Sequence, residues 1–174
     1  MKLFMKSQFS ILDIIQKDSI RQPMPPFTTS TLVQESSRKL GFTVKRTNAA
    51  AQKLYEAGYI TYMRTDSTLM SVEAQLDAKK CVEEKYGKEY ISDIIRGGKK
   101  KGDAKTQDAH EAIRPTDITR KTLPDTMHPR EIKMYELIWK NTVESCMSDA
   151  ICSSLTSKIS APKNHDYRYT CELI

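Results

Sequence analysis

The sequence lacks the patterns that mark membrane spans, exported precursors and metal-binding modules. No apolar run is long enough to cross a bilayer, and the N-terminus does not read as a signal peptide. The four cysteines form no C-x-x-C pair and have no metal-ligand spacing with the three histidines. We therefore expect reduced, mostly buried thiols in an intracellular protein, and no metal bound by this chain itself.

The charge balance is basic but does not by itself identify a partner. Lys and Arg number 28 and Asp and Glu 22, so the net charge is +6 and the pI is near 9.1. This favours a polyanionic partner and is equally typical of a basic surface that faces only solvent. The run Lys99, Lys100 and Lys101 lies in a glycine-rich segment, where a solvated loop is the default interpretation and a nucleic-acid backbone contact the alternative.

Capping residues and apolar spacing predict four helices. They span residues 28–40 or 30–40, 47–57, 71–86 and 129–147. Gly41 suits the end of the first helix because glycine takes a positive φ without steric cost. Thr47 and Ser71 are the expected N-caps of the second and third, and Pro129 suits the first position of the fourth.

Alternating apolar and polar residues predict strands near both ends of the chain. One lies within residues 1–22, where a short helix is the alternative. Two more, in 155–159 and 167–173, form a hairpin about a turn at 162–166. The ends of the chain therefore pair in a small sheet. Aromatic and β-branched residues at 59–63 predict a further short strand, and residues 108–112 a single helical turn.

Together these elements predict a mainly α fold with minor β structure. Two helices, a short turn and a strand follow the order of a winged helix of the CAP-like kind, and an ordinary helical hairpin is the alternative. Prolines 23, 25 and 26 form a stiff connector. We expect a strand-rich segment at 1–24, a helical domain at 25–148 and return strands at 149–174, within an excised piece of a longer protein.

Residues 58–67, GYITYMRTDS, concentrate the chemistry of the chain. Strand side chains alternate, so Tyr62, Arg64 and Asp66 are expected on one face. A phenol, with a pKa of ~10, becomes a nucleophile once it loses its proton, and a guanidinium can grip phosphate oxygens and offset transition-state charge. The ordinary alternatives are a tyrosine packed at the edge of a core and a surface ion pair between Arg64 and Asp66.

Three stretches in order along the chain resemble the motifs of type IA DNA topoisomerases. They read PFTTSTL at 26–32, GYITYMRTDS at 58–67 and QDAHEAIRPTD at 107–117. Three blocks in the family's order are far more specific than any one of them, and the resemblance covers residues 24–145 well. Met63 favours the topoisomerase I branch of the family over the topoisomerase III-like branch.

The resemblance implies a catalytic role for the tyrosine of the second block. Tyr62 would attack a DNA phosphodiester to form a 5′-phosphotyrosine link and free a 3′-hydroxyl, and the strand would rejoin without ATP. Arg64 would be the cation that stabilises the phosphate in the transition state. Asp66 would hold Arg64 in place, because a carboxylate near phosphate is unfavourable unless a cation intervenes.

Other residues of the three blocks are expected to support this chemistry. His110 and Arg114 match family residues that lie near the tyrosine, and imidazole has a suitable pKa to donate to a phosphate. Glu111 would orient His110 or cap a helical turn. Thr61 and Ser67 either cap turns or donate to phosphate, with turn capping the simpler role.

The resemblance also implies parts that this chain does not carry. In the family a Toprim domain binds Mg²⁺ through an Asp-x-Asp cluster, and this sequence has no Asp-x-Asp. The chain would be the tyrosine-bearing helical domain with the roots of a strand-rich arch. With the remaining domains it would relax negatively supercoiled DNA through single-stranded segments, in the cytoplasm on the nucleoid, and alone it would be inactive. The alternative is a non-catalytic winged-helix module in which Tyr62 and Arg64 only contact the DNA backbone.

Overall fold

The chain divides into a unit built from strands and a unit built from helices. The structure, a computed structural model, describes residues 6–93, 111–162 and 165–173. One compact unit comprises residues 1–22 and 149–174, and the other comprises residues 23–148. The α+β class expected from the sequence is confirmed. Within the described ranges, no helix combines the length and the apolar character needed to cross a membrane.

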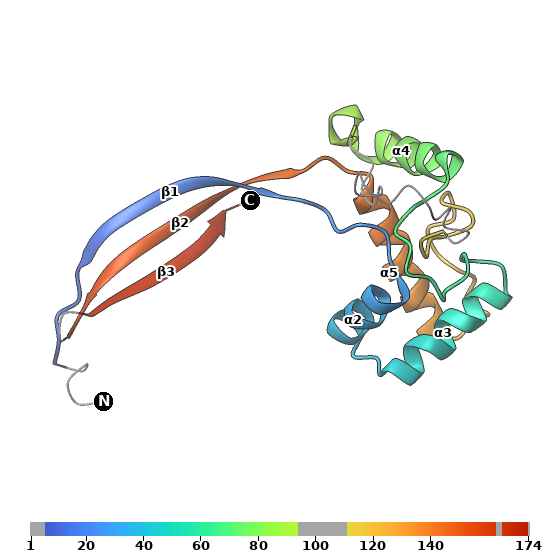
Figure 1. The fold of residues 1–174 in the computed structure, drawn as a ribbon, viewed down its shortest axis with the longest axis horizontal. Helices are drawn as coiled ribbons and strands as arrows, with labels where there is room; N and C mark the ends of the chain where they lie inside the picture. The colour runs from blue at the N-terminus through green and yellow to red at the C-terminus, as the bar shows by residue number, and fades with distance from the viewer. Residues whose placement is uncertain (1–5, 94–110, 163–164, 174) are drawn as a thin grey trace, which may run out of the picture. The chain divides into compact units, whose positions relative to one another are not determined.

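The strand unit is an antiparallel sheet with β2 in the middle (Figure 1). Its strands are β1 (Ile11–Arg21), β2 (Ala150–Ala161) and β3 (His165–Leu173). The predicted pairing of the two chain ends and the predicted hairpin are both confirmed. Polar contacts join neighbouring strands, including an ion pair of 2.9 Å between Lys158 Nζ and Asp166 Oδ2.

The helical unit packs around α5. Its helices are α2 (Thr29–Leu40), α3 (Val44–Glu56), α4 (Val72–Tyr86) and α5 (Pro129–Ser145), with a short 3₁₀ turn, η1, at Lys88–Tyr90. α5 contacts α2, α3 and α4 (Figure 1). On its inner face Met134, Tyr135 and Ile138 are almost fully buried. This apolar face was evident from the sequence because its residues recur at helical spacing.

Local capping signals located three of the four helices to within two residues. Thr28 and Ser71 accept backbone N–H bonds as N-caps of α2 and α4, as their side chains suggested. Gly41 ends α2 with φ of 65°, a conformation that suits glycine. Pro129 occupies the first position of α5.

The predicted start of α3 is wrong. The helix begins at Val44, because the side chain of Thr43 accepts a bond from the Arg46 amide at 3.3 Å. The expected cap, Thr47, lies inside the helix and is 1% exposed. Two threonines four residues apart both suit a cap, and burial of Thr47 in the core selects the earlier one.

The predicted strand at residues 59–63 is also wrong. The chain bends at Tyr59, Thr61 and Met63, and its only bridge within the described ranges joins Ile60 to Pro115. A single bridged pair does not make a strand, which needs consecutive paired residues. Of the predicted turn at 108–112, residues 108–110 lie outside the described ranges, as does the lysine run 99–101, while Glu111 and Ala112 are not helical.

Two aromatic side chains of α5 hold the segment 117–120. The Tyr135 hydroxyl donates to the Arg120 carbonyl at 2.6 Å, and the Trp139 indole N–H donates to the Ile118 carbonyl at 2.8 Å. Burial raises the pKa of Tyr135 to about 12, and the negative charge of Asp117 adds to the shift. Since the neutral phenol is the form that donates, this bond stabilises the fold in that form.

Replacing Tyr135 with Phe should lower the free energy of unfolding by about 1 kcal/mol, because the fold loses the part-buried hydrogen bond to the Arg120 carbonyl. The parent should also carry a pH dependence that the variant lacks. The folded pKa of Tyr135 exceeds the unfolded value of 10.0, so its stabilisation is complete below pH 10.0 and is lost as the pH rises toward about 12. Urea unfolding on both sides of pH 10.0 measures the difference, and equal losses in the two proteins would contradict this assignment.

The sheet should be the less protected part of the isolated chain. Among its described residues only Cys152 is buried, whereas Ile11, Ile20 and Ile151 are 63%, 70% and 79% exposed. A small sheet needs an apolar face packed on another element for independent stability. Hydrogen exchange followed by mass spectrometry should show amides of β1 to β3 exchanging faster than those of α5. Equal protection of the sheet and α5 would refute this expectation.

Candidate active site

Backbone pairing fixes the chain that leads into Tyr62. The Thr61 amide donates to the Arg114 carbonyl at 2.9 Å, and the Thr116 amide donates to the Tyr59 carbonyl at 3.0 Å. These bonds join the second sequence block to the third. The conformation of the residues before Tyr62 therefore depends on a segment more than fifty residues away.

Thr29, the first residue of α2, forms hydrogen bonds with the backbone just after Tyr62. Its hydroxyl donates to the Met63 carbonyl at 2.7 Å, lies 3.0 Å from the Thr65 carbonyl and accepts from the Thr65 amide at 2.9 Å. The Thr29 amide also donates to the Thr65 carbonyl at 2.9 Å. The backbone on both sides of Arg64 is thereby fixed by the first sequence block.

Side chains in this segment alternate although no strand forms. The side chains of Tyr62, Arg64 and Asp66 are exposed. Those of Met63, Thr65 and Ser67, which alternate with them, are buried. The tyrosine, the guanidinium and the carboxylate therefore face solvent together.

The Tyr62 side chain stands at the surface beside α3. It is 40% exposed, and its ring meets the ring of Tyr55 edge-on, with 5.1 Å between centroids and 61° between planes. Such edge-to-face contacts favour one ring orientation. Tyr55 precedes Tyr62 by seven residues, and no signal in the sequence marked it as a neighbour.

Arg64 and Asp66 line a hollow of about 480 Å³ at the N-terminal end of α2. Thr28, Thr29 and Ser30 complete its wall. Within the described part of the chain Arg64 and Asp66 form no ion pair with each other, so the expected support of Arg64 by Asp66 is not seen. The positive end of the α2 dipole and the guanidinium favour an anion in this hollow, and the carboxylate of Asp66 opposes it.

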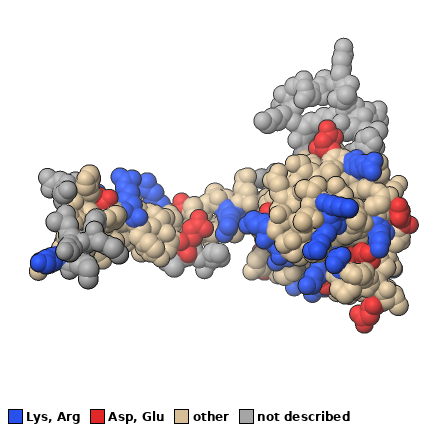
Figure 2. Space-filling model, turned by 90° about the horizontal axis from the view of Figure 1, so that it is seen from below, with Lys and Arg blue, Asp and Glu red and all other residues tan. Residues whose placement is uncertain are grey.

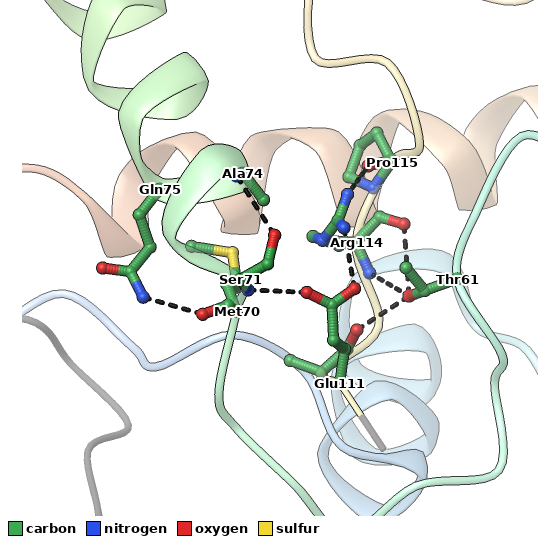
Figure 3. A network of polar contacts seen from close by, with 9 residues as sticks. Thr61, Met70, Ser71, Ala74, Gln75, Glu111, Arg114 and Pro115 are labelled. Atoms are coloured by element: carbon green, nitrogen blue, oxygen red, sulfur yellow. Dashed lines mark hydrogen bonds and ion pairs between the residues drawn. The ribbon is translucent and has the colours of Figure 1, made fainter. Parts of the chain in front are cut away.

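Glu111 and Arg114, both in the third sequence block, form an ion pair (Figure 3). Glu111 accepts from the Ser71 amide at 2.6 Å through Oε1 and pairs with Arg114 Nη2 at 2.7 Å through Oε2. The Arg114 Nη1 donates to the Pro115 carbonyl at 2.9 Å. The Arg114 guanidinium is 16% exposed and is used largely within the fold. Both oxygens of Glu111 are thus occupied by groups other than His110, which lies outside the described ranges.

Two hydroxyl residues of the second block, Thr61 and Ser67, form hydrogen bonds within the protein. The Thr61 hydroxyl donates to the Ala112 carbonyl at 2.7 Å and accepts from the Arg114 amide at 3.0 Å (Figure 3). The Ser67 hydroxyl accepts from the Leu69 amide at 3.2 Å and so supports a turn. Both contacts are structural. Sequence reasoning missed Thr29, although it lies in the first block, because its role depends on the distant segment that it contacts.

The described residues do not fit a magnesium site. No group of three or more His, Cys, Asp or Glu side chains within the described ranges could hold a metal ion. Of the carboxylates near Tyr62, that of Glu111 is already engaged by Arg114 and the Ser71 amide. Mg²⁺ is bound by several oxygen ligands, including carboxylates, and this arrangement does not supply them.

Comparisons with known proteins agree on one family. A family model described as DNA topoisomerase matches residues 1–172. DNA topoisomerase 1 of the cyanobacterium Synechocystis is 47% identical over 151 residues, which cover 85% of this chain and 16% of that protein. The prokaryotic-type DNA topoisomerase 1 of Acanthamoeba polyphaga mimivirus is 45% identical over 164 residues, covering 94% and 19%.

The solved structures include a full-length topoisomerase I from Thermotoga maritima that matches with a TM-score of 0.74 and 31% identity. The match covers 95% of this chain and 27% of that one. The chain therefore spans less than a fifth of these two curated relatives and about a quarter of the solved enzyme. Both its sequence and its fold place it in one group: the chain belongs to the type IA DNA topoisomerase family.

Proposed function

We propose that this chain carries the nucleophile of a type IA DNA topoisomerase, with Tyr62 attacking a phosphodiester of single-stranded DNA. The observation that carries the proposal is the exposed face shared by Tyr62 and Arg64, on a backbone held on both sides by distant segments. Precise placement of a nucleophile and a cation lowers the entropy cost of reaching the transition state.

The proposed reaction exchanges one phosphodiester for another. The Tyr62 hydroxyl loses its proton to water or a nearby base, and its oxygen bonds to the phosphorus. The bond from phosphorus to the 3′ oxygen breaks, and that oxygen takes up a proton, leaving a 5′-phosphotyrosine link. Reversal restores the DNA strand, so no ATP is needed.

Arg64 is the proposed phosphate ligand. Its guanidinium lines the hollow at the start of α2 and forms no ion pair with a described residue, so its charge is available to an anion. Thr29, Thr61 and Arg114 are positioning residues, since their contacts hold the backbone around the reacting groups. We keep Asp66, Ser67 and His110 as supporting residues of the same site.

We infer that the remaining activity lies in parts of the enzyme outside this chain. A Toprim domain would supply Mg²⁺, and the complete enzyme would relax negatively supercoiled DNA by single-strand passage. We assign residues 25–148 as the tyrosine domain, with α2 and α3 in a winged-helix-like order, and 1–24 with 149–174 as part of an arch. Alone, the chain should bind single-stranded DNA weakly and relax no supercoils.

Covalent trapping tests the nucleophile. The chain is mixed with the remaining domains of a type IA enzyme, Mg²⁺ and single-stranded DNA labelled at its 3′ end, and then denatured. A labelled protein band is expected, because the 5′-linked product keeps the label. Tyr62→Phe should abolish the band, whereas the matched control Tyr55→Phe, which removes the neighbouring hydroxyl, should keep it.

The outcomes separate the two readings of the site. A band that persists in Tyr62→Phe would exclude this residue as the nucleophile. If the parent gives no band while salt-sensitive DNA binding remains in all three proteins, the chain is a non-catalytic DNA-binding module.

Removing the Arg64 guanidinium should slow cleavage without abolishing DNA binding. Loss of one group that stabilises transition-state charge costs about 10²–10³ in rate. We expect Arg64→Ala to lower the single-turnover rate of band formation by that factor and Arg64→Lys to recover part of it. A rate within about threefold of the parent in Arg64→Ala would remove Arg64 from the catalytic set.

A further inference from the structure

A second hollow in the helical unit lies between α3 and the N-terminal part of α5, and we call it the α3–α5 groove. Its volume is about 610 Å³. Four of the side chains that line it are cations, namely Lys45, Arg46, Lys53 and Arg130. One, Glu131, is an acid. The groove therefore carries a formal surplus of three positive charges.

The single acid of the groove is already neutralised from within the protein. Glu131 is 7% exposed, its Oε1 pairs with Lys53 Nζ at 3.2 Å, and its Oε2 accepts from the His128 amide at 3.1 Å. Lys45, Arg46 and Arg130 form no ion pair with any described residue. Figure 2 shows Lys and Arg side chains gathered on one face of this unit. Three neighbouring unpaired cations repel one another and so favour an anionic ligand.

The ends of two long helices add to the field in the groove. Thr43 and His128, the N-caps of α3 and α5, both line it. The N-terminus of a helix carries a partial positive charge, which favours phosphate groups. The side chains and the backbone thus act in the same direction.

Three residues that line the α3–α5 groove, Arg46, Ala50 and Lys53, lie on the side of α3 away from Tyr55. Arg46, Ala50 and Lys53 follow one another at three- and four-residue steps, and so share a face. Tyr55, whose ring contacts Tyr62, is about 200° around the axis from Lys53, since each residue turns an α-helix by about 100°. Much of the groove therefore faces away from the ring that contacts Tyr62.

We infer that the α3–α5 groove binds the phosphate backbone of a DNA segment other than the one that Tyr62 cleaves. That the ligand is DNA rests on the proposed function. That it binds in this groove rests on the unpaired cations there. A backbone contact reads charge and not sequence, so the groove should bind DNA of any sequence.

A salt titration tests the groove. Binding of the full chain to a fluorescent oligothymidylate is measured over a range of salt concentrations, for the parent and for the triple variant Lys45→Gln, Arg46→Gln and Arg130→Gln. Each phosphate contact on single-stranded DNA contributes about 0.7 to the slope of log K against log salt, so the slope should fall by about 2. The control Lys79→Gln, Lys80→Gln and Lys88→Gln removes equal charge from α4 and η1 and should leave the slope nearly unchanged.

Equal slopes in the triple variant and the parent would overturn the groove proposal, and so would equal reductions in the triple variant and the control. Melting temperatures of all three proteins confirm that each is folded. Covalent trapping by Tyr62 in the same proteins separates this result from the proposed function. If the slope falls but no covalent trapping occurs, the groove proposal is supported and the proposal that Tyr62 is the nucleophile is rejected. If trapping occurs but the slope is unchanged, the nucleophile proposal is supported and the groove proposal is rejected.

A photocrosslinker at Ala49, which lines the groove, identifies the occupant in the mixture of this chain and the remaining domains. Crosslinks to labelled DNA, retained in Tyr62→Phe, are expected. Crosslinks only to another polypeptide would show that an acidic protein surface fills the groove, and would overturn the proposal.

Discussion

The arrangement of this site depends on hydrogen bonds that two distant segments make to an irregular stretch of backbone. Residues 113–116 bind the chain just before Tyr62, and the hydroxyl of Thr29 binds the chain just after it. Neither contact is part of a regular ladder. The exposed face of Tyr62 and Arg64 therefore exists only when three sequence blocks, separated by tens of residues, are folded together.

α5 supports that arrangement indirectly, through the segment that follows residues 113–116. Its side chains Tyr135 and Trp139 bind carbonyls in 117–120, and that segment continues directly from 113–116. The salt bridge between Glu111 and Arg114 joins the same region to the start of α4 through the Ser71 amide. A packed helical core thus positions a site that lies on a loop, as is common for functional sites.

Charge is distributed in this chain according to what each cation contacts. Arg114 and Lys53 are paired with carboxylates inside the helical unit and serve the fold. Arg64, Arg46 and Arg130 have no such partner among the described residues and lie in two separate hollows. Net charge alone could not distinguish these groups, because it counts paired and unpaired cations equally.

The sequence by itself determined the features that depend on neighbouring residues. Caps such as Thr28 and Ser71, the glycine stop at Gly41 and the apolar spacing of α5 located helices, because these signals act within a few residues. The alternating ends of the chain predicted the hairpin and its third strand. The three motif blocks identified Tyr62 and Arg64 as the residues to examine.

Tertiary structure decided what required contacts between distant residues. Thr47 is buried inside α3, which starts earlier than the sequence predicts, and the stretch 59–63 meets the third block through the bridge of Ile60 with Pro115 instead of forming a strand. The role of Thr29, the contact of Tyr55 with Tyr62 and the meeting of α3 with α5 at a basic groove left no local mark. Hydrogen bonds and packing between residues far apart in sequence are set by the whole fold, and a local pattern carries no record of them.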